Sequence, residues 1–272
     1  MTGHVTAPAA ALADQLPGWV SLLRAPNPGP LTLDGTNTWV VRAPGAAGAI
    51  VIDPGTAEDG HLEAIAKHVP ISSILVTHGH PDHVGGVVEL AERVDARVFG
   101  PVPGHPPVTA GAVFTAGEVR LTALATPGHT ADSVCFLAEH ADVKVIFTGD
   151  TILGRGTTVI AEPDGDLGAY LDSLELLAAY DGVPALPGHG PALADCGAAA
   201  RFYLAHRRAR LDQVRQALAD GAQTVQDVVA TIYADVDRSL WPAAEWTVRA
   251  QLKYLTRQTG ESAPGTMGLD TL

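Results

Sequence analysis

The chain has 272 residues, of which 46% are hydrophobic and 17% are charged, a composition that excludes disordered, collagen-like and coiled-coil proteins. A globular chain of this length buries enough surface to fold without disulfide bonds. The formal net charge is −13; residues 1–200 carry −14 and residues 201–272 carry +1, so the two parts differ electrostatically.

The first half of the chain predicts alternating strands and helices. Residues 49–53 and 73–77 are short β-branched apolar runs that end in turns or polar clusters, which is typical of buried strands. A helix is expected between them at 58–68. A second helix at 86–94 and a strand at 96–100 follow, giving the order β, α, β, α, β.

The pattern then changes to strands separated by short turns. Three strand-like segments lie within 118–147, and the breaks between them contain Pro127, Gly128 and Asp142. A helix at 167–180 and a short strand at 184–188 complete this part of the chain.

Helical periodicity dominates from Arg201 onward, where Leu204, Leu211, Val214 and Leu218 are spaced for one helix face. Thr224 opens a second predicted helix, and 241–255 form a third. We therefore predict two domains, 1–195 and 196–272, and the last residues, 260–272, are expected to be a loose tail.

The sequence favours a reduced, cytoplasmic protein. Cys135 and Cys196 are the only cysteines, too few for a disulfide framework or a thiolate zinc site. No apolar run reaches the roughly 18 residues of a membrane span, and the N-terminal segment lacks the basic residues of a secretion signal. We expect neither a membrane partner nor an obligate protein partner.

A dense group of possible metal ligands follows the second predicted strand, in the sequence THGHPDH at 77–83. His78 and His80 are two residues apart, so in extended chain they project to the same side, whereas Asp82 and His83 begin the next helix and can reach a second ion. Loops after buried strands are held rigidly enough to gather such ligands. A polar turn with incidental histidines is the alternative.

Three later segments repeat this arrangement, each with a His or Asp after an apolar run and beside glycine. They are TPGHT with His129, FTGD with Asp150 and LPGHG with His189. Alone, each would be an ordinary turn histidine or a helix-capping aspartate. Surface or satisfied roles are expected for the remaining histidines, which are His4, His61, His68, His105, His140 and His206.

In the order of these motifs the sequence resembles the metallo-β-lactamase superfamily, over roughly residues 18–200. The resemblance implies an α/β (α+β) fold, a four-layer αββα sandwich with a small winged-helix-like C-terminal domain, and a dinuclear site between the two sheets. By this resemblance His78, His80 and His129 hold the first ion and Asp82, His83 and His189 the second. Asp150 bridges both.

Nitrogen and carboxylate ligands without thiolate suit two Zn²⁺ ions, although iron or manganese can use the same set. Such a pair generates a hydroxide nucleophile at neutral pH. Asp82 is the expected catalytic group that takes or relays the proton.

Two further residues are expected near the site. An aspartate such as Asp53 supports the metal loop in the resembled family, although it equally suits the turn formed by Pro54 and Gly55. Asn37, with Thr36, is placed to reach the cleft floor, although a plain hairpin turn also explains it.

The segment 27–40 is similar to a subgroup containing mitochondrial beta-lactamase-like endoribonucleases and metallo-type thioesterases of fungal polyketide pathways. Asp150 disfavours true β-lactamase activity, because the resembled antibiotic-hydrolysing enzymes have Cys or Ser in the corresponding region. We expect hydrolysis of a single-stranded RNA phosphodiester or of a small-molecule ester or thioester. Hydrolysis of a small-molecule ester or thioester includes glyoxalase-like, acyl thioesterase and lactonase activities.

Two features of the sequence bear on the choice between an RNA and a thioester substrate. Residues 201–215 carry a local charge of +4, which suits either phosphate contacts or pairing with the acidic main domain. The Pro- and Gly-rich loop from Pro101 to Val113 suits an apolar channel for a thioester.

A non-catalytic interaction module stabilised by metal is a remote alternative, because seven ligands exceed what a structural site requires.

Overall fold

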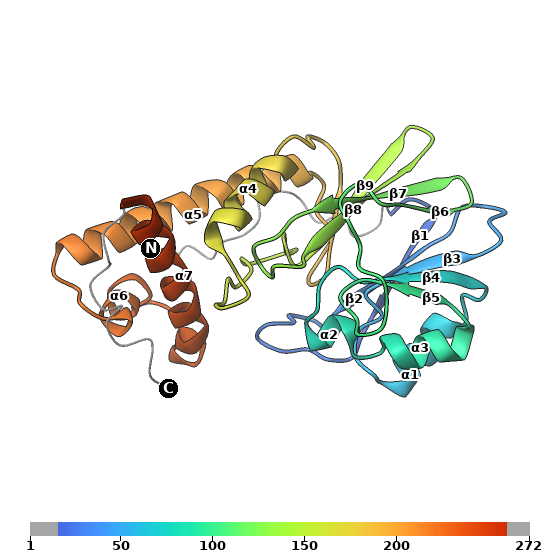
Figure 1. The fold of residues 1–272 in the computed structure, drawn as a ribbon, viewed down its shortest axis with the longest axis horizontal. Helices are drawn as coiled ribbons and strands as arrows, with labels where there is room; N and C mark the ends of the chain where they lie inside the picture. Colours follow the sequence, from blue (N-terminus) through green and yellow to red (C-terminus); the bar gives the residue numbers. More distant parts are fainter. Residues whose placement is uncertain (1–15, 260–272) are drawn as a thin grey trace.

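The computed structural model describes residues 16–259, so the predicted tail at 260–272 lies outside the described residues. Two five-stranded sheets lie face to face, with helices on their outer sides (Figure 1). The predicted four-layer αββα arrangement with a helical C-terminal part is confirmed.

The first sheet has the strand order β1-β2-β3-β4-β5. Its strands are Val20–Arg24, Asn37–Val41, Ala49–Ile52, Ile71–Leu75 and Arg97–Phe99. β1, β2 and β3 pair antiparallel, whereas β3, β4 and β5 are parallel. Parallel neighbours need crossover connections. The connections here contain α1 (Asp59–Ala66), and then α2 (Pro81–Val84) and α3 (Val87–Val94).

The second sheet has the order β10-β9-β8-β7-β6, and only the pair β9 and β10 is parallel. In chain order β6 to β10 are Val113–Ala116, Val119–Ala125, Val134–His140, Val143–Gly149 and Ala185–Pro187. α4 (Leu167–Leu177) connects β9 to β10, and Asp166 caps its first turn by accepting a hydrogen bond from the Ala169 amide.

Three apolar cores hold these layers together. Trp39, Phe136 and Phe147 lie in the core between the two sheets. A second core joins the first sheet to α1 and α3. The third joins the second sheet to α4 and to the C-terminal helices, with Tyr170 and Tyr203 fully buried in it.

The C-terminal helices are α5 (Cys196–Ala219), α6 (Val225–Ile232), the 3₁₀ turn η1 (Arg238–Leu240) and α7 (Trp241–Thr259). α5 begins five residues before the predicted start, where Asp195 caps it. Thr224 forms a capping box with Asp227, as its position before α6 suggested. α5 runs from the sheets to α6 and α7 (Figure 1); a domain boundary after residue 195 stays a prediction.

Three strands, β1, β2 and β6, were not among the predicted elements. β1 and β6 are edge strands, and polar residues at exposed positions, such as Ser21 and Thr115, interrupt their apolar pattern, whereas β2 is buried throughout. No helix within residues 16–259 combines the length and the apolar content that crossing a bilayer requires.

Candidate metal centre

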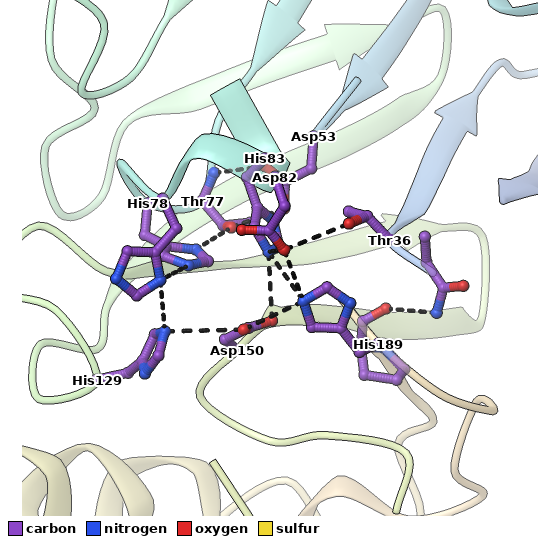
Figure 2. A network of polar contacts seen from close by, with 12 residues as sticks. Thr36, Asp53, Thr77, His78, Asp82, His83, His129, Asp150 and His189 are labelled. Carbon is purple, nitrogen blue, oxygen red and sulfur yellow. Dashed lines mark hydrogen bonds and ion pairs between the residues drawn. The ribbon is translucent and has the colours of Figure 1, made fainter. Parts of the chain in front are cut away.

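The seven predicted ligands meet because they all follow the C-terminal ends of strands, and these strand ends lie on the same side of the two sheets (Figure 2). The loop after β4 carries His78 and His80, and α2, which follows it, carries Asp82 and His83; His129 follows β7, Asp150 follows β9, and His189 follows β10. Figure 2 shows the side chains from these separate segments pointing toward one another. The fold thus brings all seven together.

Three imidazoles form one group. Nδ1 of His80 lies 3.0 Å from Nε2 of His78 and 3.0 Å from Nε2 of His129. In a tetrahedral zinc site, nitrogen ligands at 2.0–2.1 Å from the ion lie roughly 3.3 Å apart. The spacing of these nitrogens therefore fits an ion held between them.

Asp82, His83 and His189 form a second group. Nε2 of His189 lies 3.1 Å from Oδ2 of Asp82 and 3.3 Å from Nε2 of His83. All three ligand atoms lie within 4.8 Å of one another, as do those of the first group.

Asp150 lies between the two groups. Its Oδ2 is 3.3 Å from Nε2 of His189 and 3.7 Å from Nε2 of His129, and its Oδ1 is 3.5 Å from Nε2 of His83. The Oδ1 atom is buried and has no hydrogen-bond partner among residues 16–259. A buried carboxylate oxygen without a partner is costly, so its position among imidazole nitrogens fits a bound cation.

The electrostatics of the site favour positive charge. Burial alone raises the pKa of Asp150, but His83 and His189 outweigh it and hold that pKa well below its usual value. Burial lowers the pKa of His189, yet the carboxylates of Asp150 and Asp82 raise it to about 10. The two carboxylates thus increase the affinity of this pocket for a proton and, by the same attraction, for a metal ion.

Asp53 contacts the segment 77–83, which carries four of the predicted ligands. Its carboxylate accepts hydrogen bonds from the Thr77 amide at 2.8 Å and from the Thr77 hydroxyl at 2.7 Å, and its Oδ2 lies 2.8 Å from Nδ1 of His83. It holds His83 with Nε2 toward the other ligands, which is how carboxylates orient metal-binding histidines.

Two other histidines of the group, His129 and His189, are also held through Nδ1. Nδ1 of His129 lies 2.7 Å from the Val159 carbonyl and 3.1 Å from the Thr158 hydroxyl. Nδ1 of His189 lies 3.4 Å from the Gly35 carbonyl. These contacts leave Nε2 of each ring free to face the centre.

Asn37 and Thr36 have separate contacts near the site. The Asn37 amide donates to the carbonyls of Pro187 (3.0 Å) and Gly190 (2.8 Å), which brackets the turn that carries His189. The Thr36 hydroxyl donates to Oδ2 of Asp82 at 3.4 Å. Asn37 therefore stabilises the loop and does not itself reach the ligand group.

The sequence did not single out some of the residues around the site. Val159 acts through its backbone carbonyl, for which a side-chain pattern gives no signal. His61 is buried: its Nε2 lies 3.0 Å from the Thr38 hydroxyl, which donates to the Asp53 carbonyl. His61 is thus a buried, hydrogen-bonded histidine outside the ligand group, as expected. His4 lies outside the described residues.

The arginines of α5 contact groups of the protein itself. Arg201 pairs with Asp181, Arg208 with Glu175 and Arg215 with Asp212. Arg210 stacks over the Tyr233 ring, and Arg207 is buried. Of the two predicted uses of this helix, the contacts agree with pairing to acidic groups and do not support a phosphate-binding strip.

Comparisons with known proteins agree with this architecture. The sequence profile of the metallo-beta-lactamase superfamily matches residues 31–112 and 101–189, and that of the beta-lactamase associated winged helix domain matches residues 224–259. The chain is 33% identical to a lactamase-like protein, vrtG, of Penicillium aethiopicum, over 86% of this chain and 79% of that protein. It is 34% identical to an atrochrysone carboxyl ACP thioesterase of Aspergillus chevalieri, over 78% and 72%.

Solved structures share the fold. A beta-lactamase domain protein from Burkholderia ambifaria superposes with a TM-score of 0.81 over 94% of this chain and 95% of that chain, at 24% identity. A metallo-beta-lactamase family protein from Thermus thermophilus gives a TM-score of 0.72 over 89% and 94%, also at 24% identity. The chain belongs to the metallo-beta-lactamase superfamily, as a hydrolase with a C-terminal beta-lactamase associated winged helix domain.

Proposed function

We propose that this chain is a dinuclear zinc thioesterase that hydrolyses an acyl thioester. The observation that carries this proposal is the position of Asp150, whose unpartnered Oδ1 and whose Oδ2 lie between two groups of converging ligand atoms. Two groups with one carboxylate between them suit a pair of ions better than a single one.

In this proposal His78, His80 and His129 hold one ion. Asp82, His83 and His189 hold the other, and Asp150 contacts both. When bound, such a pair lowers the pKa of water to about 7 and polarises the oxygen of the bond under attack. The nitrogen and carboxylate donors suit Zn²⁺, and iron or manganese can use the same donors.

Asp82 is the residue we assign to proton transfer. Its side chain is 24% exposed, whereas those of His83 and His189 are almost fully buried, so among these three Asp82 is the most accessible to a substrate. Its Oδ2 accepts the Thr36 hydroxyl, a contact that fixes the carboxylate while leaving it able to take a proton and pass it to the leaving group.

The choice of a thioester over RNA rests on charge and on the relatives. Residues 1–200 carry a net charge of −14, which repels a polyanion, and the arginines of α5 are engaged within the protein. One relative is named as a thioesterase that acts on a carrier-protein substrate. An uncharged acyl thioester does not meet this electrostatic barrier.

The test combines metal analysis with a substrate panel. Zinc-loaded protein should hold two ions per chain and release thiol from an acyl-N-acetylcysteamine, whose leaving group carries no charge. It should lose this activity with chelator and regain it with Zn²⁺. Turnover only of a lactone, bis-p-nitrophenyl phosphate or single-stranded RNA would overturn the thioesterase assignment. No turnover of any of them would favour the non-catalytic alternative.

A matched pair of variants tests the bridging role. Asp150→Ala should lower both metal stoichiometry and rate, whereas Asp142→Ala, the same change in the exposed turn between β8 and β9, should alter neither. Two tightly bound ions and full activity in Asp150→Ala would contradict the bridging assignment.

A further inference from the structure

A buried arginine on α5 is not explained by the proposed chemistry. Arg207 is only 2% exposed and lies beside the third apolar core, with its guanidinium carbon 5.3 Å from the centre of the Tyr170 ring. One of its terminal nitrogens donates to the Thr158 carbonyl, and its Nε has no hydrogen-bond partner. Burying a charged arginine is unfavourable, so its position beside Tyr170 and its hydrogen bond to Thr158 require an explanation.

Thr158 belongs to the segment 153–166, which we call the clamp loop, between β9 and α4. The C-terminal helices fasten this loop along its length. The Tyr203 hydroxyl contacts the carbonyls of Leu153 (3.1 Å) and Gly156 (2.7 Å) at the loop's beginning. Lys253 of α7 pairs with Glu162 at 2.6 Å. At the end of the loop, Arg257 of α7 pairs with Asp166.

The same loop holds His129. The Val159 carbonyl and the Thr158 hydroxyl both contact Nδ1 of this histidine, and the Asp166 amide donates to the Gly128 carbonyl at 2.9 Å. Nδ1 is thus occupied by the clamp loop, and Nε2 faces His80 at 3.0 Å. The orientation of the imidazole therefore depends on where residues 158 and 159 lie.

These contacts form one continuous path from α5 through Thr158 to His129. We propose that Arg207 is a positioning residue for the ion held by His78, His80 and His129, so that the C-terminal helices set the affinity of this half of the metal centre. The inference rests on the proposed function, because it presumes that ions bind here. The half formed by Asp82, His83 and His189 meets the clamp loop at the loop's beginning, where the Gly154 amide donates to the His189 carbonyl at 2.9 Å. Arg207 holds the loop further along, at Thr158, so this half should be much less affected.

The test measures stepwise zinc affinity by chelator competition, with His129→Ala identifying the step that belongs to the three-histidine half. Arg207→Met should weaken that same step roughly 10- to 100-fold, the usual effect of losing an outer contact of a metal site, and change the other step much less. Arg207→Lys keeps a donor for the Thr158 carbonyl and should recover most of the affinity.

A melting measurement separates positioning from simple structural support. Arg207→Met removes an unfavourably buried charge but also leaves the buried Thr158 carbonyl without its donor, so the melting temperature of the metal-free variant should change little. Its increase in melting temperature on adding zinc should be smaller than that of the wild type. A lower melting temperature without metal, together with equal weakening of both steps, would overturn the proposal.

Two further variants complete the design. Arg208→Met is the matched control, because Arg208 is exposed on the same helix and pairs with Glu175; it should leave both affinities unchanged. If Arg207→Met does not fold, Thr158→Val decides: losing the hydroxyl contact with Nδ1 of His129 should weaken the same step. Wild-type affinities in the folded variant would overturn the inference alone, whereas a wild-type protein that binds no ions would overturn the proposed function.

Discussion

Oδ2 of Asp53 lies 2.8 Å from Nδ1 of His83, a contact that joins the end of β3 to the loop after β4. Asp53 adopts a left-handed backbone conformation with φ of 50°, and both groups are buried. An Nδ1 proton donated to this carboxylate leaves the Nε2 lone pair free for an ion, so the contact selects the tautomer that a metal ligand needs.

Asp53→Asn should therefore weaken zinc binding roughly 10- to 100-fold at the half of the site that contains His83. The amide keeps the size of the side chain but loses the charge that faces the imidazole. Chelator competition measures the change. Asp95→Asn is the control, because Asp95 has φ of 52° but lies exposed at the end of α3; zinc affinity like the wild type in both variants would contradict this role for Asp53.

Gly188→Ala should disrupt the centre by steric overlap. A Cβ atom at this position would lie 2.5 Å from Oδ1 of Asp150 and 2.8 Å from Cε1 of His83, so one of these two groups must move. We expect loss of bound metal, measured by elemental analysis, and a lower melting temperature. Gly18→Ala enters open space and should change neither property, and a Gly188→Ala protein with full metal content would refute the prediction.

Removing the metal should leave the chain folded but less stable. Three apolar cores hold the layers together without any contribution from an ion. A ligand that binds only the native state stabilises it by about 2.7 kcal/mol at 100 times its dissociation constant, so zinc should raise the melting temperature and chelator lower it. Circular dichroism checks the result; unfolding at 25 °C on chelation would show that the ions are needed for the fold.

His206 should make stability depend on pH. Burial, followed by the charges of Arg207 and Arg210, lowers the pKa of this histidine to about 4, from its usual value of 6.5. Below pH 6.5 the unfolded chain therefore binds more protons at this position than the folded chain does, so the free energy of unfolding decreases as the pH falls from 6.5 to 4.

His206→Gln should remove this part of the pH dependence while leaving the rest. Urea unfolding at several pH values between 4 and 7.5 measures it, and His105→Gln, in the loop after β5, is the control. Parallel curves for the wild type and His206→Gln would mean that His206 does not contribute.

Much of the metal centre could be predicted from local sequence because its ligands are concentrated in short motifs. His78, His80, Asp82 and His83 lie within six residues, and His129, Asp150 and His189 each follow an apolar strand beside glycine. Many strands and helices were predictable for a related reason, since β-branched runs alternate with helical periodicity, whereas the four-layer arrangement was an implication of the resemblance to the metallo-β-lactamase superfamily. Edge strands such as β1 lacked that signal, because half of their positions face solvent.

The sequence by itself determined the kinds of ligand atoms, their order along the chain and the strands that present them, because these are properties of neighbouring residues. Only the tertiary structure decided which backbone carbonyls orient the imidazoles and that Arg207 is buried against the loop around His129. His129 and the Val159 carbonyl are 30 positions apart in the sequence, and Arg207 and the Thr158 carbonyl are 49 apart. These contacts exist because α5 packs across the second sheet, and no local pattern records that packing.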